Sequence, residues 1–163
     1  MSSVRKKPWN RVNLPVYSIS SQNKKGKENM HMITYVTSIS MQPKRMVCGV
    51  YRGTQTLDNV LEQGEFVLQL LSANQYTLTR ILGKTSGKKT DKLAYLRKKQ
   101  LVETWQDYSI LSDALSVLRL RIIEQFDGGD HVGFLCDVVA YKNLHPGEPL
   151  TLDILRAHQL ISI

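Results

Sequence analysis

Residues 46–66, MVCGVYRGTQTLDNVLEQGEF, contain the strand and helix signals on which the fold prediction rests. The apolar, β-branched run at 45–51 is typical of a strand. Beyond it, apolar residues recur at helical spacing, Thr56 is a suitable N-cap, and a glycine suits the position after the last turn. We therefore expect a short helix over residues 57–63, followed by a second apolar strand over residues 65–71.

Further strand signals lie on both sides of this stretch. The segment HMITYVTSIS at 31–40 alternates in a period of two, which predicts a strand that a proline-containing turn joins to 45–51. Two long strand candidates, 116–125 and 131–141, flank a turn at 126–130 whose glycines suit a hairpin. Helices are expected over 73–82, 91–99 and 152–160, with a polar loop at 83–90.

Five or more strands with short helices and no repeated βαβ alternation predict a mainly β protein whose strands form a closed antiparallel barrel. A Rossmann fold is disfavoured because the sequence has no G-x-G-x-x-G.

Residues 1–28 are polar and predict an extended N-terminal arm, in which the apolar patch at 14–17 could pair as an edge strand. Residues 29–163 then form one domain.

The composition is that of a soluble globular protein. The chain has 163 residues, 42% hydrophobic and 22% charged, and no apolar run long enough to cross a bilayer. Its two cysteines, Cys48 and Cys136, lie in apolar stretches, which predicts buried free thiols and a cytoplasmic location.

The net charge is +8 at pH 7. Such a charge fits nucleic-acid binding, a solvated basic surface, or attraction of a phosphorylated small molecule. The basic clusters are scattered along the chain and no nucleic-acid-binding motif accompanies them, so nucleic acid is the least favoured of the three.

The start of the predicted helix could hold an anion. Thr54 and Thr56 precede backbone N–H groups that have no partner within a helix, and the guanidinium of Arg52 can contact phosphate oxygens. The alternative is that Thr56 only caps the helix and Arg52 is a surface residue. His131 is either a base or a structural hairpin residue, and the four histidines have no metal-ligand spacing.

Four segments together resemble the flavin reductase and flavoredoxin family. NMHMITY at 29–35 is similar to the family's N-x-M-T start, and 46–66 resembles its block of an apolar strand, R-x-x-x-T, a short helix and G-x-F. SGKKTDK at 86–92 is similar to S-G-x-x-x-D-K, and Gly129-Asp130-His131 matches a G-D-H hairpin. The four occur in the family's order and span most of the chain.

This resemblance implies a homodimeric Greek-key split β-barrel that binds FMN, with FAD as the alternative flavin. It also implies NADH or NADPH as hydride donor to the flavin, and His131 as the residue that orients the nicotinamide. The implied flavin contacts are Asn29, Thr34, Tyr35, Val36, Thr37, Arg52, Thr54, Thr56 and Lys92, and no metal is implied.

Two other functions stay open at this point: an FMN electron carrier of the flavoredoxin type, which exchanges electrons with an acceptor protein, and a basic nucleic-acid-binding domain. The sequence also departs from the family pattern. Tyr35 stands where many relatives carry tryptophan, Gln69 stands at a family asparagine position, and residues 161–163 lack a C-terminal aromatic side chain.

Overall fold

A seven-stranded antiparallel sheet forms the framework of the protein. The computed structural model describes residues 6–162. The strands of the sheet are β1 (Tyr17–Gln22), β2 (Glu28–Ile33), β3 (Val36–Ser40), β4 (Arg45–Tyr51), β5 (Glu65–Leu70), β8 (Ser116–Asp127) and β9 (His131–Asn143). They follow the order β2-β1-β5-β8-β9-β4-β3, and a separate hairpin pairs β6 (Val102–Trp105) with β7 (Tyr108–Leu111).

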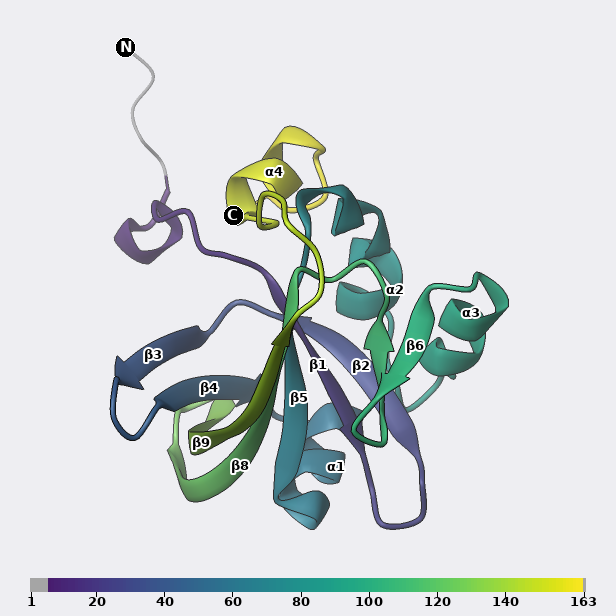
Figure 1. The fold of residues 1–163 in the computed structure, drawn as a ribbon. Helices are drawn as coiled ribbons and strands as arrows, with labels where there is room; N and C mark the ends of the chain where they lie inside the picture. The colour runs from purple at the N-terminus through teal and green to yellow at the C-terminus, as the bar shows by residue number, and fades with distance from the viewer. Residues whose placement is uncertain (1–5, 163) are drawn as a thin grey trace.

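Short helices lie around the sheet (Figure 1). They are η1 (Pro8–Asn10), α1 (Gln55–Gln63), η2 (Ala73–Leu78), α2 (Thr79–Gly83), α3 (Lys92–Lys98) and α4 (Leu152–Ala157). This confirms the expected mainly β fold with short helices, including β4, β5 and the long hairpin β8–β9. The expected closed barrel is wrong, because the pairing among the described strands ends at β2 on one side and β3 on the other.

The single strand expected over 31–40 is two strands that belong to opposite edges of the sheet. β2 ends at Ile33 and pairs with β1, whereas β3 begins at Val36 and pairs with β4. Between them, Val36 N donates to Thr34 O at 3.0 Å, and Gly49 N donates to Tyr35 O at 2.8 Å. The period of two continues through this break, so it could not be seen in the sequence pattern.

Residues 17–22 are not part of an extended arm. They form β1, which lies between β2 and β5 in the sheet and is therefore not an edge strand. The sequence pattern missed it because half of its residues are serines, all of them buried. Two of these serines are hydrogen-bonded: Ser20 Oγ donates to Ser109 O at 2.6 Å, and Ser21 Oγ donates to Asn29 O at 3.2 Å. Residues 1–5 of the expected arm lie outside the described residues.

Two of the three apolar clusters among the described residues form the larger cores of the protein. One is enclosed by the curved sheet and α1, and it includes Ile19, Phe66 and Phe134. Cys48 and Cys136 are buried in it as free thiols, and burial raises the pKa of each, which confirms the prediction of buried thiols. The second core packs η2 and α2 to α4 against the neighbouring strands.

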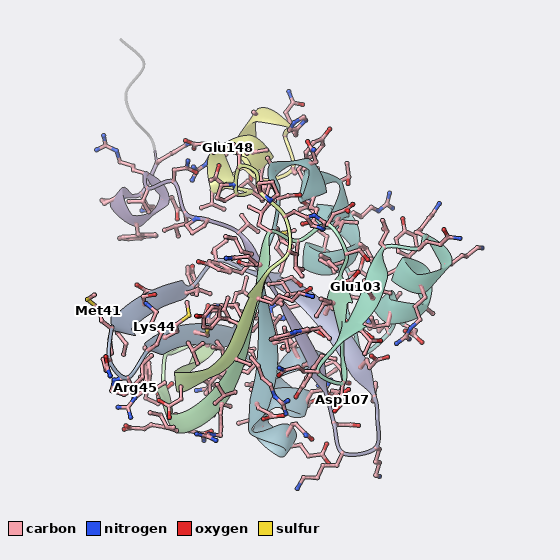
Figure 2. The ribbon with its side chains drawn as sticks, in the orientation of Figure 1. Met41, Lys44, Arg45, Glu103, Asp107 and Glu148 are labelled. Atoms are coloured by element: carbon pink, nitrogen blue, oxygen red, sulfur yellow. The ribbon has the colours of Figure 1, made fainter. Side chains whose placement is uncertain are left out.

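At the far end of the sheet, Met41 and Lys44 mark the β3–β4 turn, where the Met41 side chain is almost fully exposed (Figure 2).

The hairpin β6–β7, for which the sequence pattern gave no signal, is fastened to the sheet by Gln69. This fully buried side chain accepts a hydrogen bond from Leu111 N at 2.6 Å, and its Nε2 faces Met30 Sδ at 3.7 Å.

Replacing Gln69 by leucine should lower the free energy of unfolding by about 1–3 kcal/mol, because the buried N–H of Leu111 would lose its acceptor. Chemical denaturation of Gln69→Leu against the exposed-strand control Gln125→Leu measures the difference. Equal stability of the two variants would contradict the fastening role.

Candidate functional site

A cavity of about 460 Å³ lies where β2, the start of α1 and the segment after α2 meet, a size typical of small-molecule sites. Four of its lining side chains can carry positive charge: His31, Lys84, Lys92 and His131. No aspartate or glutamate is among the described residues that line it. This arrangement favours an anionic ligand.

Asn29 joins three walls of this cavity. Its Nδ2 donates to Thr56 Oγ1 at 2.8 Å, which ties β2 to α1. Gly87 of the loop lies so close that a Cβ there would meet Asn29 Oδ1 at 2.2 Å. Thr56 is completely buried and does not line the cavity, so its hydroxyl positions Asn29.

The first turn of α1 differs from the expectation, because Thr54 and not Thr56 is the N-cap. Leu57 N donates to Thr54 Oγ1 at 3.1 Å, and the same hydroxyl donates to Tyr51 O at 2.9 Å. Thr54 lines the cavity together with its neighbours Gly53 and Gln55. The earlier start of the helix places the N–H groups of its first turn at the cavity wall.

Arg52 is not brought to the cavity. Its Nε donates to Gly129 O at 2.8 Å, and a terminal nitrogen of the guanidinium pairs with Asp127 Oδ1 at 2.9 Å. Arg52 thus holds the turn between β8 and β9, which is the turn that presents His131. Contacts between sequence-distant segments decided this placement, and the motif around Arg52 could not reveal it.

Lys92 is the buried cation of the site. Only 3% of the residue is exposed, and its Nζ donates to Leu82 O at 3.2 Å. Desolvation lowers its pKa to about 8, and no ion pair to a described carboxylate offsets this cost. A buried ammonium with donors to spare is suited to a phosphate.

The loop over the cavity is fastened by a neighbouring lysine. Lys88 Nζ pairs with Asp58 Oδ2 of α1 at 3.1 Å. The loop backbone from Lys84 to Gly87 is thereby held against the cavity, and its residues Thr85 and Ser86 complete the lining.

An aromatic wall closes the other end. The ring of His131 lies edge-on to Tyr35, with ring centroids 4.9 Å apart, and edge-on to Tyr51 at 5.2 Å. Its Nδ1 is 2.7 Å from Asp130 Oδ1, so the carboxylate orients the imidazole. Gly49 lies beneath Tyr35, where a Cβ would approach Tyr35 Cβ to 3.3 Å.

Val36 and Thr37 belong to a second, mostly apolar cavity of about 430 Å³. It shares Thr34, Tyr35 and His131 with the first cavity, so these residues form the wall between the two. The structure therefore distributes the backbone from Thr34 to Thr37 over both cavities.

His31 and Tyr51 line the first cavity but were not singled out from the sequence. His31 lies on the same face of β2 as Asn29 and Ile33, two positions away from each. That alternation is the signal that could have identified it once the strand was placed.

The described residues 6–162 contain no group of three or more histidine, cysteine, aspartate or glutamate side chains that could hold a metal ion. None of their helices is long and apolar enough to span a membrane.

Comparison with known structures identifies the fold. A flavoredoxin from Methanosarcina acetivorans superposes with a TM-score of 0.72 at 20% identity, over 91% of this chain and 79% of its own. An FMN-binding protein from Thermus thermophilus gives 0.72 at 21% identity, over 88% and 80%. A Sinorhizobium meliloti protein, provisionally assigned as an oxidoreductase, gives 0.75 at 18% identity over 88% of this chain, which spans only 48% of its length. The sheet is thus that of the flavin reductase split barrel.

A search of curated proteins finds no match for this chain. A protein-family model, the flavin reductase like domain, matches residues 9–157. This match begins inside the segment that we expected to be a separate arm and includes every residue of the cavity. The chain therefore belongs to the flavin reductase like domain family.

Proposed function

We propose that the chain binds FMN in the cavity between β2, α1 and the loop after α2, and that it catalyses reduction of the flavin by NADH or NADPH. FAD is the alternative flavin. One observation carries the proposal: the same cavity contains a buried cation and an aromatic wall. The cation is Lys92, which forms no ion pair with a described carboxylate. Membership of the flavin reductase like domain family supports it.

The side chains present fit such a ligand. Lys92 and the polar loop residues Thr85 and Ser86 would bind the phosphate, because a dianion needs cations and hydrogen-bond donors. Tyr35 and His131 would border the isoalloxazine ring, since flat aromatic side chains suit a planar conjugated system.

The protein's contribution to the reaction is alignment. A bound flavin would accept a hydride at N5 from nicotinamide C4, which oxidises the nicotinamide and reduces the flavin by two electrons. His131, held by Asp130, would orient the nicotinamide, and the second cavity beside it offers apolar space for that ring.

An electron carrier of the flavoredoxin type is the second candidate. The observation in its favour is the exposure of Tyr35, 59% of which is open to solvent at the aromatic wall. An acceptor protein could approach the ring there. The nucleic-acid alternative has no comparable support, because the cations of the site line a cavity of small-molecule size.

The proposal includes a homodimer in the cytoplasm. Exposed apolar side chains lie on β3, β8 and β9, namely Ile39, Ile123, Phe126, Val139 and Tyr141, and would be covered by a second copy. The two buried free thiols suit a reducing compartment. Light scattering of the purified protein and microscopy of a tagged chain test these two points.

Lys92→Met should weaken FMN binding about tenfold or more and leave riboflavin binding within about twofold, because only FMN carries the phosphate. In the unaltered protein, FMN affinity should fall between pH 7 and pH 9, since Lys92 loses its proton above its pKa of about 8. Fluorescence titration measures both effects, with the exposed Lys98→Met of the same helix as control. Equal losses for FMN and riboflavin would place the phosphate elsewhere.

Anaerobic mixing of the FMN-loaded protein with NADH or NADPH should rapidly bleach the visible absorbance of the flavin. His131→Ala should slow this step about tenfold while FMN affinity changes less than about threefold, because the residue would orient the donor. His145→Ala, at an exposed histidine outside the cavity, serves as control. Slow bleaching by both nucleotides, beside prompt reduction by a redox protein, would favour the electron carrier.

A further inference from the structure

His31 is a polar side chain of the cavity to which the proposed function gives no role. It lies in β2, where it pairs in register with Ile19 of β1, and its side chain lines the cavity. The Nδ1 atom is sealed from solvent and makes no hydrogen bond to any described residue. A buried polar nitrogen without a partner is costly, so the environment of this ring needs an explanation.

The sealed Nδ1 determines which form of the ring is stable. A proton on Nδ1 would be a buried donor without an acceptor, so the neutral ring keeps its single proton on Nε2. Nε2 makes no hydrogen bond within the described chain and is not sealed, which leaves it open to the cavity. His31 therefore presents one N–H donor to a ligand.

The ring stays neutral at physiological pH. Burial, and after it the positive charges of Lys92 on α3 and of His131 on β9, together lower the pKa of His31 to about 4. The loop adds Lys84, and no described carboxylate lines the cavity to oppose these charges. Above about pH 5 the imidazole can donate a hydrogen bond, but it supplies no charge.

His31 is also placed between the two ends of the cavity. Along β2 and the segment that follows it, His31 lies between Asn29, against which the loop packs at Gly87, and Tyr35 of the aromatic wall. A ligand with its phosphate at Lys92 and its ring at the aromatic wall must pass His31 with its middle section. In a flavin nucleotide that section is a chain of hydroxyl groups, each of which can accept a hydrogen bond.

We infer that His31 is a binding residue for the polyol section of the ligand, to which its Nε2–H donates a hydrogen bond. This inference rests on the proposed function, because it takes a flavin nucleotide as the ligand. It goes beyond that function by assigning three parts of the ligand to three side chains: phosphate to Lys92, polyol to His31 and ring to Tyr35.

Three ligands that differ by one part each test the assignment. FMN carries phosphate, ribityl chain and ring, riboflavin lacks the phosphate, and lumiflavin lacks both the phosphate and the ribityl chain. His31→Leu should weaken FMN and riboflavin about fivefold each, the effect of one neutral hydrogen bond, and leave lumiflavin within about twofold. His31→Gln, which keeps a donor, should recover most of the loss. Lys92→Met should affect FMN alone.

Titration of the ligands at two pH values distinguishes a neutral His31 from a charged one. The loss in His31→Leu should be the same at pH 6 and pH 8, because the ring is neutral at both. Nitrogen NMR of the unaltered protein should show a neutral imidazole with its proton on Nε2, and this signal should shift with riboflavin more than with lumiflavin. The NMR measurement requires no variant, so it stands even if His31→Leu does not fold.

The outcomes separate the two proposals. If none of the three ligands binds the unaltered protein, the proposed function fails and this inference fails with it. If flavins bind but His31→Leu weakens lumiflavin as much as riboflavin, or weakens neither, the inference alone is overturned. A loss confined to FMN, or one that grows at pH 6, would make His31 a phosphate ligand and overturns the polyol assignment as well.

Discussion

A buried hydrogen bond from the Asn29 amide to the Thr56 hydroxyl joins an edge strand of the sheet to the first turn of α1. The backbone of the loop at Gly87 packs directly against the same amide, so three sequence-distant walls of the cavity meet at one side chain. β2 is an edge strand among the described strands of the sheet, and both α1 and the loop contact it. This junction holds β2, the start of α1 and the loop together at the cavity.

The electrostatics of the cavity follow from what this junction encloses. Lys92 is buried, and among the described residues its Nζ donates to the carbonyl oxygen of Leu82 alone. Folding therefore carries the cost of desolvating the ammonium, which appears as the lowered pKa. A ligand phosphate would offset that cost. Because the ammonium is already desolvated in the folded chain, binding of the phosphate would not have to desolvate it again. His31 shares this environment, and its neutral ring reflects the same burial and the same charge.

The resemblance to known motifs pointed to part of the lining of this cavity, while the flavin contacts themselves stay a prediction. Asn29, Thr34, Tyr35, Thr54, Lys92 and His131 do line one cavity, although they come from five separate segments. Thr56 supports that cavity from outside its surface, and Arg52 holds the hairpin turn that carries His131. Motif positions report which residues a family keeps together, but they do not say whether a residue contacts a ligand or a neighbouring side chain. That distinction depends on hydrogen bonds such as those of Thr56 and Arg52.

The sequence alone determined the elements whose signals are local: β4, α1 with Gly64 at its end, β5, and the long hairpin β8–β9. Their apolar periods, caps and turn residues act over a few positions, so each could be recognised without its partners. The tertiary structure decided the break after Ile33, the serine-rich β1 within the sheet, and the sealed nitrogen of His31. These features depend on which distant segment lies opposite, because burial and hydrogen-bond satisfaction arise only when the chain has closed upon itself.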